Sequence, residues 1–194
     1  MSPTLTRIVA RRCSAASARL RGLSNRFANV LRGLGLGGDG VEAGDRVAIL
    51  LPQRRETVVA HVAAFKAGCI SLPLFTLFGP EALLHRLRDS GARVLVTDHA
   101  SLPLVEGIRD QLPDLEVIFT VDGSAAAGDA QDFDAALAAA SDAFTPVRSL
   151  ANAPALLIYT SGTTGNPKGA LHAHRVLLGH LPGVEMSHDF LPQP

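Results

Sequence analysis

The sequence predicts an α/β fold, in which parallel-sheet βαβ units bring strands and helices together in alternation. Short apolar runs that suit buried strands recur at 47–51, 94–96, 117–119 and 155–158. Segments with apolar residues at helical spacing separate most of these runs, and this alternation is typical of a parallel sheet. The run at 47–51 is apolar at every position, as expected for a strand that helices cover on both faces.

Each element follows from its local pattern. Leu20, Leu23, Phe27 and Leu31 recur every three or four residues, which predicts a helix over 20–34, and the glycine-rich stretch "GLGLGGDG" ends it. Similar patterns, with proline near the first turn of two segments, predict further helices. The expected helices are 54–66, 80–88, 102–112 and 133–141. The expected strands are 47–51, 68–74, 92–98, 115–122 and 153–160, with a loop over 179–194.

Composition excludes several classes of protein. With 47% hydrophobic and 19% charged residues, the chain has the profile of a globular protein and not of a disordered one. Its net charge of zero argues against a protein that grips nucleic acid through its overall charge. No apolar run approaches the ~20 residues that span a membrane. Two widely spaced cysteines favour a reducing compartment, so we expect a cytoplasmic protein.

The first 38 residues carry seven arginines and no acid. Such a composition occurs in organelle transit peptides, but it also suits a basic first helix, which we favour.

The segment after the last predicted strand contains the main candidate site. Small hydroxyl residues, glycines and one lysine follow a buried strand, at the end where ligands bind in open α/β sheets. Glycines allow backbone N–H groups to approach an anion, hydroxyls add donors, and lysine adds a compact positive charge. The pattern favours a phosphate-binding loop over an ordinary surface turn. The candidate residues are Thr160, Ser161, Gly162, Thr163, Thr164, Gly165 and Lys168.

The spacing does not fit two common nucleotide-binding loops. In a Walker A loop the lysine follows glycine and precedes Ser or Thr, whereas Lys168 lies between Pro167 and Gly169. The glycines at 33–38 end a helix and do not follow a strand, so they fit a Rossmann fingerprint poorly.

Other residues give weaker signals. His172 and His174 would share a face of a strand, but partly buried or surface histidines are the simpler interpretation than a metal site. Asp129, Asp132 and Asp134 lack the glycine and glutamate of an EF-hand loop. No G-x-S-x-G elbow of a serine hydrolase is present.

The stretch "YTSGTTGNPKG" at 159–169 resembles the signature loop of the adenylate-forming enzymes, which include acyl-CoA synthetases. The segments "AAFKAGCISLPLF" and "RLRDSGARVLVTD" resemble the same family. The resemblance implies a two-step ligase: a carboxylic acid attacks ATP to form an acyl-adenylate, and coenzyme A then takes the acyl group. It also implies that the loop holds the β- and γ-phosphates, with Mg²⁺ bound through ATP and no metal site of the protein itself.

The resemblance begins near Leu20, since the aromatic-x-Glu-Leu pattern of the family is replaced by Ser17-Ala18-Arg19-Leu20. We therefore expect 1–19 to be an unassigned basic segment and 20–194 to be a partial, truncated large domain. In the family, the adenine, ribose and acyl sites and a catalytic lysine lie beyond this part. We expect the chain alone to be inactive as a ligase. The alternatives are a catalytically silent remnant that binds nucleotide or a partner, and an unrelated phosphate-loop NTPase.

Overall fold

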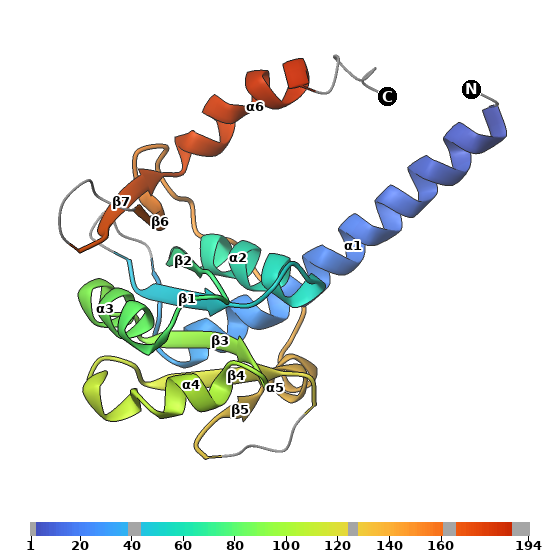
Figure 1. The fold of residues 1–194 in the computed structure, drawn as a ribbon. Coiled ribbons are helices and arrows are strands. Elements are labelled where there is room, and N and C mark those ends of the chain that lie inside the picture. Colours follow the sequence, from blue (N-terminus) through green and yellow to red (C-terminus); the bar gives the residue numbers. More distant parts are fainter. Residues whose placement is uncertain (1–2, 39–43, 124–127, 161–165, 188–194) are drawn as a thin grey trace.

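The computed structural model describes residues 3–38, 44–123, 128–160 and 166–187, and Figure 1 shows the fold. The helices are α1 (Pro3–Gly33), α2 (Arg55–Ala67), α3 (Pro80–Ser90), α4 (Leu102–Glu106), the 3₁₀ turn η1 (Arg109–Gln111), α5 (Phe133–Ala139) and α6 (Arg175–Ser187). The strands are β1 (Arg46–Leu50), β2 (Ile70–Leu74), β3 (Val94–Asp98), β4 (Val117–Val121), β5 (Gln131–Asp132), β6 (Pro154–Thr160) and β7 (Lys168–Ala173).

The strands form one sheet in the order β5-β4-β3-β1-β2-β6-β7. All neighbours pair in parallel except β6 and β7, which form an antiparallel hairpin at one edge. The predicted α/β class with a mostly parallel sheet is therefore confirmed. Because parallel strands end on the same side, the carboxyl ends of β1, β2 and β6 meet at one rim of the sheet.

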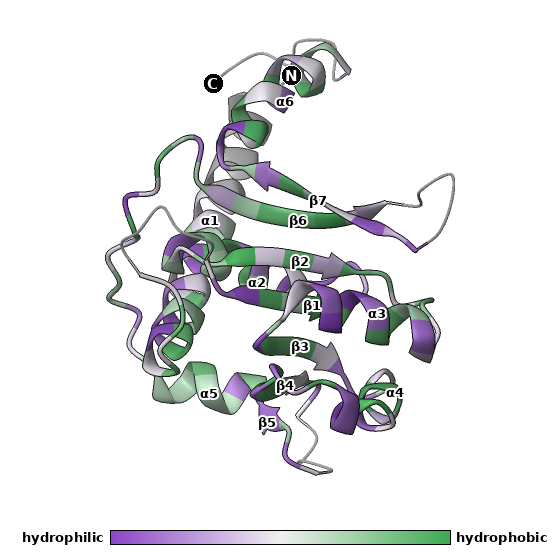
Figure 2. Cartoon of the chain, turned by 90° about the vertical axis from the view of Figure 1, so that its left-hand side faces the viewer, coloured by the Kyte–Doolittle hydropathy of each residue, from purple (hydrophilic) through white to green (hydrophobic). Residues whose placement is uncertain are grey.

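Helices cover both faces of the central strands, as Figures 1 and 2 show. Val47 and Ile49 of β1 pack with α1, α2 and α5 in one apolar cluster. Ala48 and Leu50 of the same strand pack with α3 and α4 in a second cluster. Since successive side chains of a strand point to opposite faces, a strand covered on both faces must be apolar throughout, which explains the run at 47–51.

Three predicted segments differ from the structure. The helix expected over 20–34 begins at Pro3, so α1 includes most of the segment left unassigned. The helix expected over 102–112 stops at Glu106 and continues only as a 3₁₀ turn. The loop expected over 179–194 was wrong in its first part, because α6 runs to Ser187 with Pro182 inside it. Residues 188–194 lie outside the described residues.

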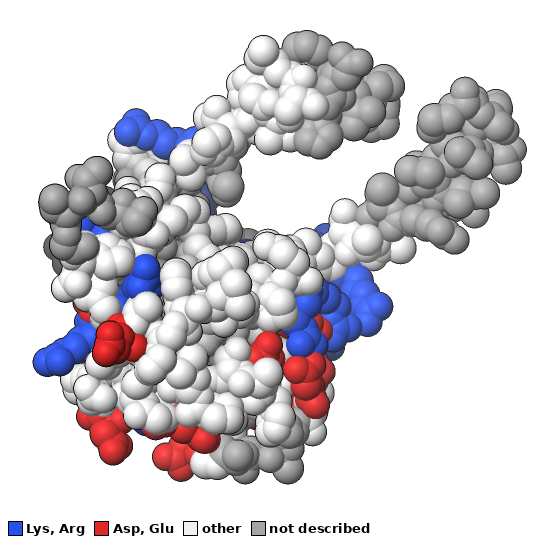
Figure 3. Space-filling view, viewed as in Figure 1, with Lys and Arg blue, Asp and Glu red and all other residues white. Residues whose placement is uncertain are grey.

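Two helices extend away from the body of the molecule. Figure 1 shows the first half of α1 and the whole of α6 projecting beyond the sheet. Several large apolar side chains of α6 and β7 are exposed, namely Leu171, Leu178, Leu181, Val184 and Met186. Among the described residues, none of the helices combines the length and apolarity needed to cross a bilayer. In Figure 3, charges of both signs lie around the visible face, and its centre is largely uncharged.

Candidate functional site

The hairpin of β6 and β7 carries the predicted phosphate loop. Thr160, the last residue of β6, pairs with Lys168, the first residue of β7, and both are exposed. The loop therefore leaves and re-enters the sheet at one point of its rim. Five candidate residues, Ser161 to Gly165, fall outside the described residues, so their contribution to phosphate binding stays a prediction.

Helix α3 supports both ends of this loop. The Tyr159 hydroxyl donates to Asp89 at 2.6 Å, and His85 Nε2 donates to the carbonyl oxygen of Pro167 at 3.0 Å. The rings of His85 and Tyr159 also meet edge to face, with centroids 6.0 Å apart. Burial and the hydrogen bond to Asp89 raise the pKa of Tyr159, so this phenol stays protonated at neutral pH. The contacts fix the backbone on either side of the candidate loop.

Gly169 lets the two strands of the hairpin pack closely just after Lys168. A Cβ at this position would lie 2.9 Å from Leu157 Cδ1 and 3.4 Å from the Tyr159 ring. The absence of a side chain lets β7 cross the Tyr159 ring closely, and the tyrosine can then reach Asp89.

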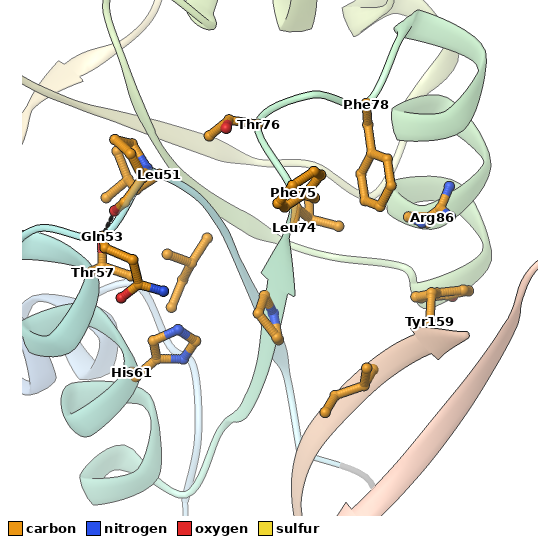
Figure 4. A pocket seen from close by; sticks show the side chains of 14 residues that line it. Leu51, Gln53, Thr57, His61, Leu74, Phe75, Thr76, Phe78, Arg86 and Tyr159 are labelled. Atoms are coloured by element: carbon orange, nitrogen blue, oxygen red, sulfur yellow. Dashed lines mark hydrogen bonds between the residues drawn. The ribbon is translucent and has the colours of Figure 1, made fainter. Parts of the chain in front are cut away.

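A pocket of about 520 Å³ opens beside the hairpin, beyond the carboxyl ends of β1, β2 and β6 (Figure 4). Its volume lies within the range of small-molecule sites in proteins. Apolar side chains form most of its wall, including Leu51, Leu74, Phe75 and Ile158. Tyr159 lines it as well, so the pocket and the phosphate loop are adjacent along β6.

Polar side chains enter this pocket from two sides. In Figure 4, Gln53, Thr57 and His61 lie on the side of α2, and Arg86 lies on the side of α3. His61 Nδ1 is 2.6 Å from the hydroxyl oxygen of the buried Ser71, and burial lowers the pKa of His61. The imidazole is therefore neutral at physiological pH and is available for hydrogen bonding to an uncharged group.

Sequence reasoning missed this pocket. Its residues are scattered over β1, α2, β2, α3 and β6, and no spacing rule connects them. One signal was present: the aromatic residues Phe75 and Phe78 follow a buried strand, where a turn is usually polar.

Other candidates from the sequence gain no chemical role. Among the described residues there is no group of three His, Cys, Asp or Glu side chains that could hold a metal ion. Burial and the nearby Asp45 carboxylate raise the pKa of the Cys69 thiol to about 12. This free cysteine therefore stays protonated and belongs to the apolar core.

Comparisons with known proteins show the family to which the chain belongs. A model of the family "AMP-binding enzyme" matches residues 6–192. Acetyl-coenzyme A synthetase of Halorhodospira halophila is 35% identical over 180 residues, which are 86% of this chain and 27% of that protein. Mouse mitochondrial acyl-coenzyme A synthetase ACSM1 is 32% identical over 154 residues, or 79% of this chain and 26% of that protein.

Solved structures give the same result. The anthranilate CoA ligase AuaEII in complex with anthranoyl-AMP superposes with a TM-score of 0.77 at 32% identity, over 85% of this chain and 31% of that one. Acetoacetyl-CoA synthetase from Streptomyces lividans has a TM-score of 0.77 at 27% identity, and the match covers 87% of this chain and 27% of that one. The chain thus spans about a quarter of the length of the curated relatives it matches. The family model covers nearly all of these residues, and the chain belongs to the family of AMP-binding enzymes.

Proposed function

We propose that this chain supplies the triphosphate-binding part of an ATP-dependent carboxylate–CoA ligase. The observation that carries the proposal is the position of Thr160 and Lys168, paired at the mouth of a glycine- and hydroxyl-rich loop on the ligand-binding rim of a parallel sheet. Two of the proteins it resembles are called acetyl- and acyl-coenzyme A synthetases.

In this proposal the loop binds and orients without forming a bond to the substrate. Hydroxyls of Thr160, Ser161, Thr163 and Thr164 donate to the β- and γ-phosphate oxygens, and Lys168 balances part of their charge. Gly162 and Gly165 allow the backbone to approach. When bound, Mg²⁺ shields the phosphates, and ATP itself brings the ion to the site. The leaving pyrophosphate is stabilised by positioning and electrostatics.

The acid, ATP and coenzyme A are proposed as substrates of the whole ligase, with the cytoplasm as its compartment. The isolated chain spans about a quarter of its relatives, and we propose that it does not catalyse acyl-adenylate formation alone. Substrate-dependent exchange of labelled pyrophosphate into ATP by the purified chain would overturn this part.

The loop is tested by calorimetric titration of ATP–Mg²⁺ into the wild type and into the variant Thr163→Ala/Lys168→Ala. Loss of a charge-assisted hydrogen bond costs about 1.5–3 kcal/mol, so the dissociation constant should rise roughly 10- to 100-fold. Arg148→Ala is the matched control, because Arg148 is an exposed cation outside the loop of Thr160 to Lys168.

Three outcomes separate the alternatives. Equal affinity of the double variant and the wild type would contradict the loop assignment. No binding by the wild type at millimolar ATP would favour a silent remnant. ATP hydrolysis without any carboxylic acid would favour an NTPase.

A further inference from the structure

Arg86 is a buried cation that forms no ion pair among the described residues. It lies on α3 with only 7% of its surface exposed. Nη1 donates to the carbonyl oxygen of Ala82 at 2.7 Å, but Nε is buried without a hydrogen-bond partner. None of the ion pairs found within the described ranges involves this guanidinium.

The aromatic neighbours of Arg86 contact only the flat faces of its guanidinium group. Its Cζ atom lies 3.9 Å from the centroid of the Phe78 ring and 5.7 Å from that of Tyr159. Cation–π contacts act through the flat face of a guanidinium, whereas its N–H groups lie in the plane and require acceptors. A buried charge with unsatisfied donors is costly, and fold stability alone gives no reason to keep it.

The unpaired cation is part of the wall of the 520 Å³ pocket. Figure 4 shows Arg86 on one side of the pocket, beside Phe78 and Tyr159, with Leu74 and Phe75 between it and the side of α2. An anionic group placed beside Arg86 would find a cation in a surrounding of low polarity, where the attraction is stronger than in water. The neighbouring apolar wall suits an uncharged body attached to that group.

We propose that this pocket is an anion subsite in which Arg86 pairs with the carboxylate or phosphate of a small organic ligand whose apolar part lies against Leu74 and Phe75. The proposal that the pocket binds an anion rests on the unpaired guanidinium and on the pocket itself. Its assignment to a substrate of the ligase rests on the proposed function.

The chain carries its own probe for this test. Tyr159 lines the pocket and is the one tyrosine of a sequence without tryptophan, so intrinsic fluorescence reports on this position alone. The anionic ligands are cyclohexanecarboxylate and cyclohexyl phosphate. The uncharged control is cyclohexanecarboxamide, which has nearly the same shape as cyclohexanecarboxylate. We expect a saturable change with at least one anion and a dissociation constant at least about tenfold higher for the amide.

Substitutions locate the binding. Arg86→Gln should raise the dissociation constant of the anion about tenfold or more, whereas Arg86→Lys should retain part of the affinity. Arg88→Gln removes the same charge two residues along α3 from an exposed position and should change nothing. Equal binding of anion and amide by the wild type, or no binding of either anion, would overturn the proposal even if Arg86→Gln fails to fold.

The relative affinities of the two anions distinguish a carboxylate ligand from a phosphate ligand. Tighter binding of cyclohexanecarboxylate would point to a ligand that carries a carboxylate, and tighter binding of cyclohexyl phosphate would point to a ligand that carries a phosphate. Lys168→Ala should weaken binding of ATP–Mg²⁺ but not of cyclohexanecarboxylate, because Lys168 belongs to the loop and does not line the pocket. A failure of ATP to bind at the loop therefore remains distinguishable from a failure of this subsite.

Discussion

At the scale of residues, the two lysines of the chain have different settings. Lys168 is exposed at the mouth of the loop, whereas Lys66 ends a helix against α1. Its ammonium donates to Arg21 O at 3.3 Å, Ser24 Oγ at 2.8 Å and Asn25 Oδ1 at 2.7 Å. Three acceptors around one point suit an ammonium and not the planar fork of arginine. Burial and the nearby Arg21 lower the pKa of Lys66.

Lys66→Met should lower the free energy of unfolding by about 1–3 kcal/mol, because it leaves acceptors of α1 without a donor. Urea denaturation followed by circular dichroism measures the change. Arg148→Met, at an exposed position, serves as the control and should change stability by less than about 0.5 kcal/mol. Equal stability of the Lys66 variant and the wild type would contradict the structural role of Lys66.

His61 makes stability depend on pH. Burial places its pKa below the usual value, so the folded state binds a proton less readily than the unfolded state. Stability is therefore complete above the unfolded pKa near 6.5 and falls as pH decreases below it. We expect His61→Gln to flatten the curve of unfolding free energy between about pH 7 and pH 5.

The control for this curve is His99→Gln, because His99 is exposed. A wild-type curve that is already flat in this window, or an equal effect of both substitutions, would refute the assignment. His174 contributes in the same direction, since burial lowers its pKa too, so the His61 variant should keep a residual slope.

Residue patterns predicted one part of the candidate site and missed the other. The loop could be predicted because its hydroxyls, glycines and lysine are nearly consecutive, so the candidate residues are local in sequence. The pocket brings together Leu51, His61, Leu74, Arg86 and Tyr159, which only the parallel pairing of β1, β2 and β6 makes neighbours. Burial of Arg86 follows from tertiary packing and cannot be predicted from the composition of the sequence.

At the scale of elements, the turn between α1 and β1 depends on Gly37. Its φ is +76°, and a Cβ would lie 2.0 Å from the carbonyl oxygen of Ala67 at the end of α2. Its N–H donates to Asp45 Oδ2 at 2.9 Å, and Asp45 also accepts from Arg93 Nη1 at 2.7 Å. The turn thus joins α1, α2 and the start of the sheet.

Gly37→Ala should destabilise the fold by about 2–4 kcal/mol, because backbone strain adds to a clash with main-chain atoms. Gly35→Ala is the matched control: Gly35 has φ +73°, but nothing lies within 4 Å of its added Cβ. The control should cost only about 1 kcal/mol. Thermal melts of the two variants measure the difference, and equal melting temperatures would refute the role of the close approach.

Elements buried on both faces were predicted well, and the edge elements were not. Residues 47–50 of β1 and the first three residues of β3 and of β4 are continuous apolar runs because helices cover both faces, and that pattern is visible in the sequence. β7 is an edge strand of small and polar residues, "KGALHA", held by its pairing with β6. α6 contains Pro182, which has a low helix propensity, and its leucines at 178 and 181 are exposed. Neither helix propensity nor an apolar face buried in the core therefore predicts this helix.

At the scale of the whole molecule, the two sides of the sheet differ. Helices cover the strands on one side, whereas apolar residues are exposed at the edge formed by β6 and β7. The core side of the sheet, β3 to β5, is covered by α1, α4 and α5, whereas β6, β7 and α6 expose Ile158, Leu171, Leu178 and Leu181. The candidate loop belongs to the open edge. The division of the chain at residue 19 stays a prediction, although α1 and the family match both continue across it.

Phosphate binding by the loop is tested most directly by calorimetric titration of the chain with pyrophosphate–Mg²⁺ and, separately, with AMP. If the loop of Thr160 to Lys168 is a cradle for the β- and γ-phosphates, pyrophosphate should bind and should compete with ATP. AMP has neither phosphate and should bind at least about tenfold more weakly. Binding of AMP as tight as that of ATP, with no binding of pyrophosphate, would contradict the assignment of this loop to the β- and γ-phosphates.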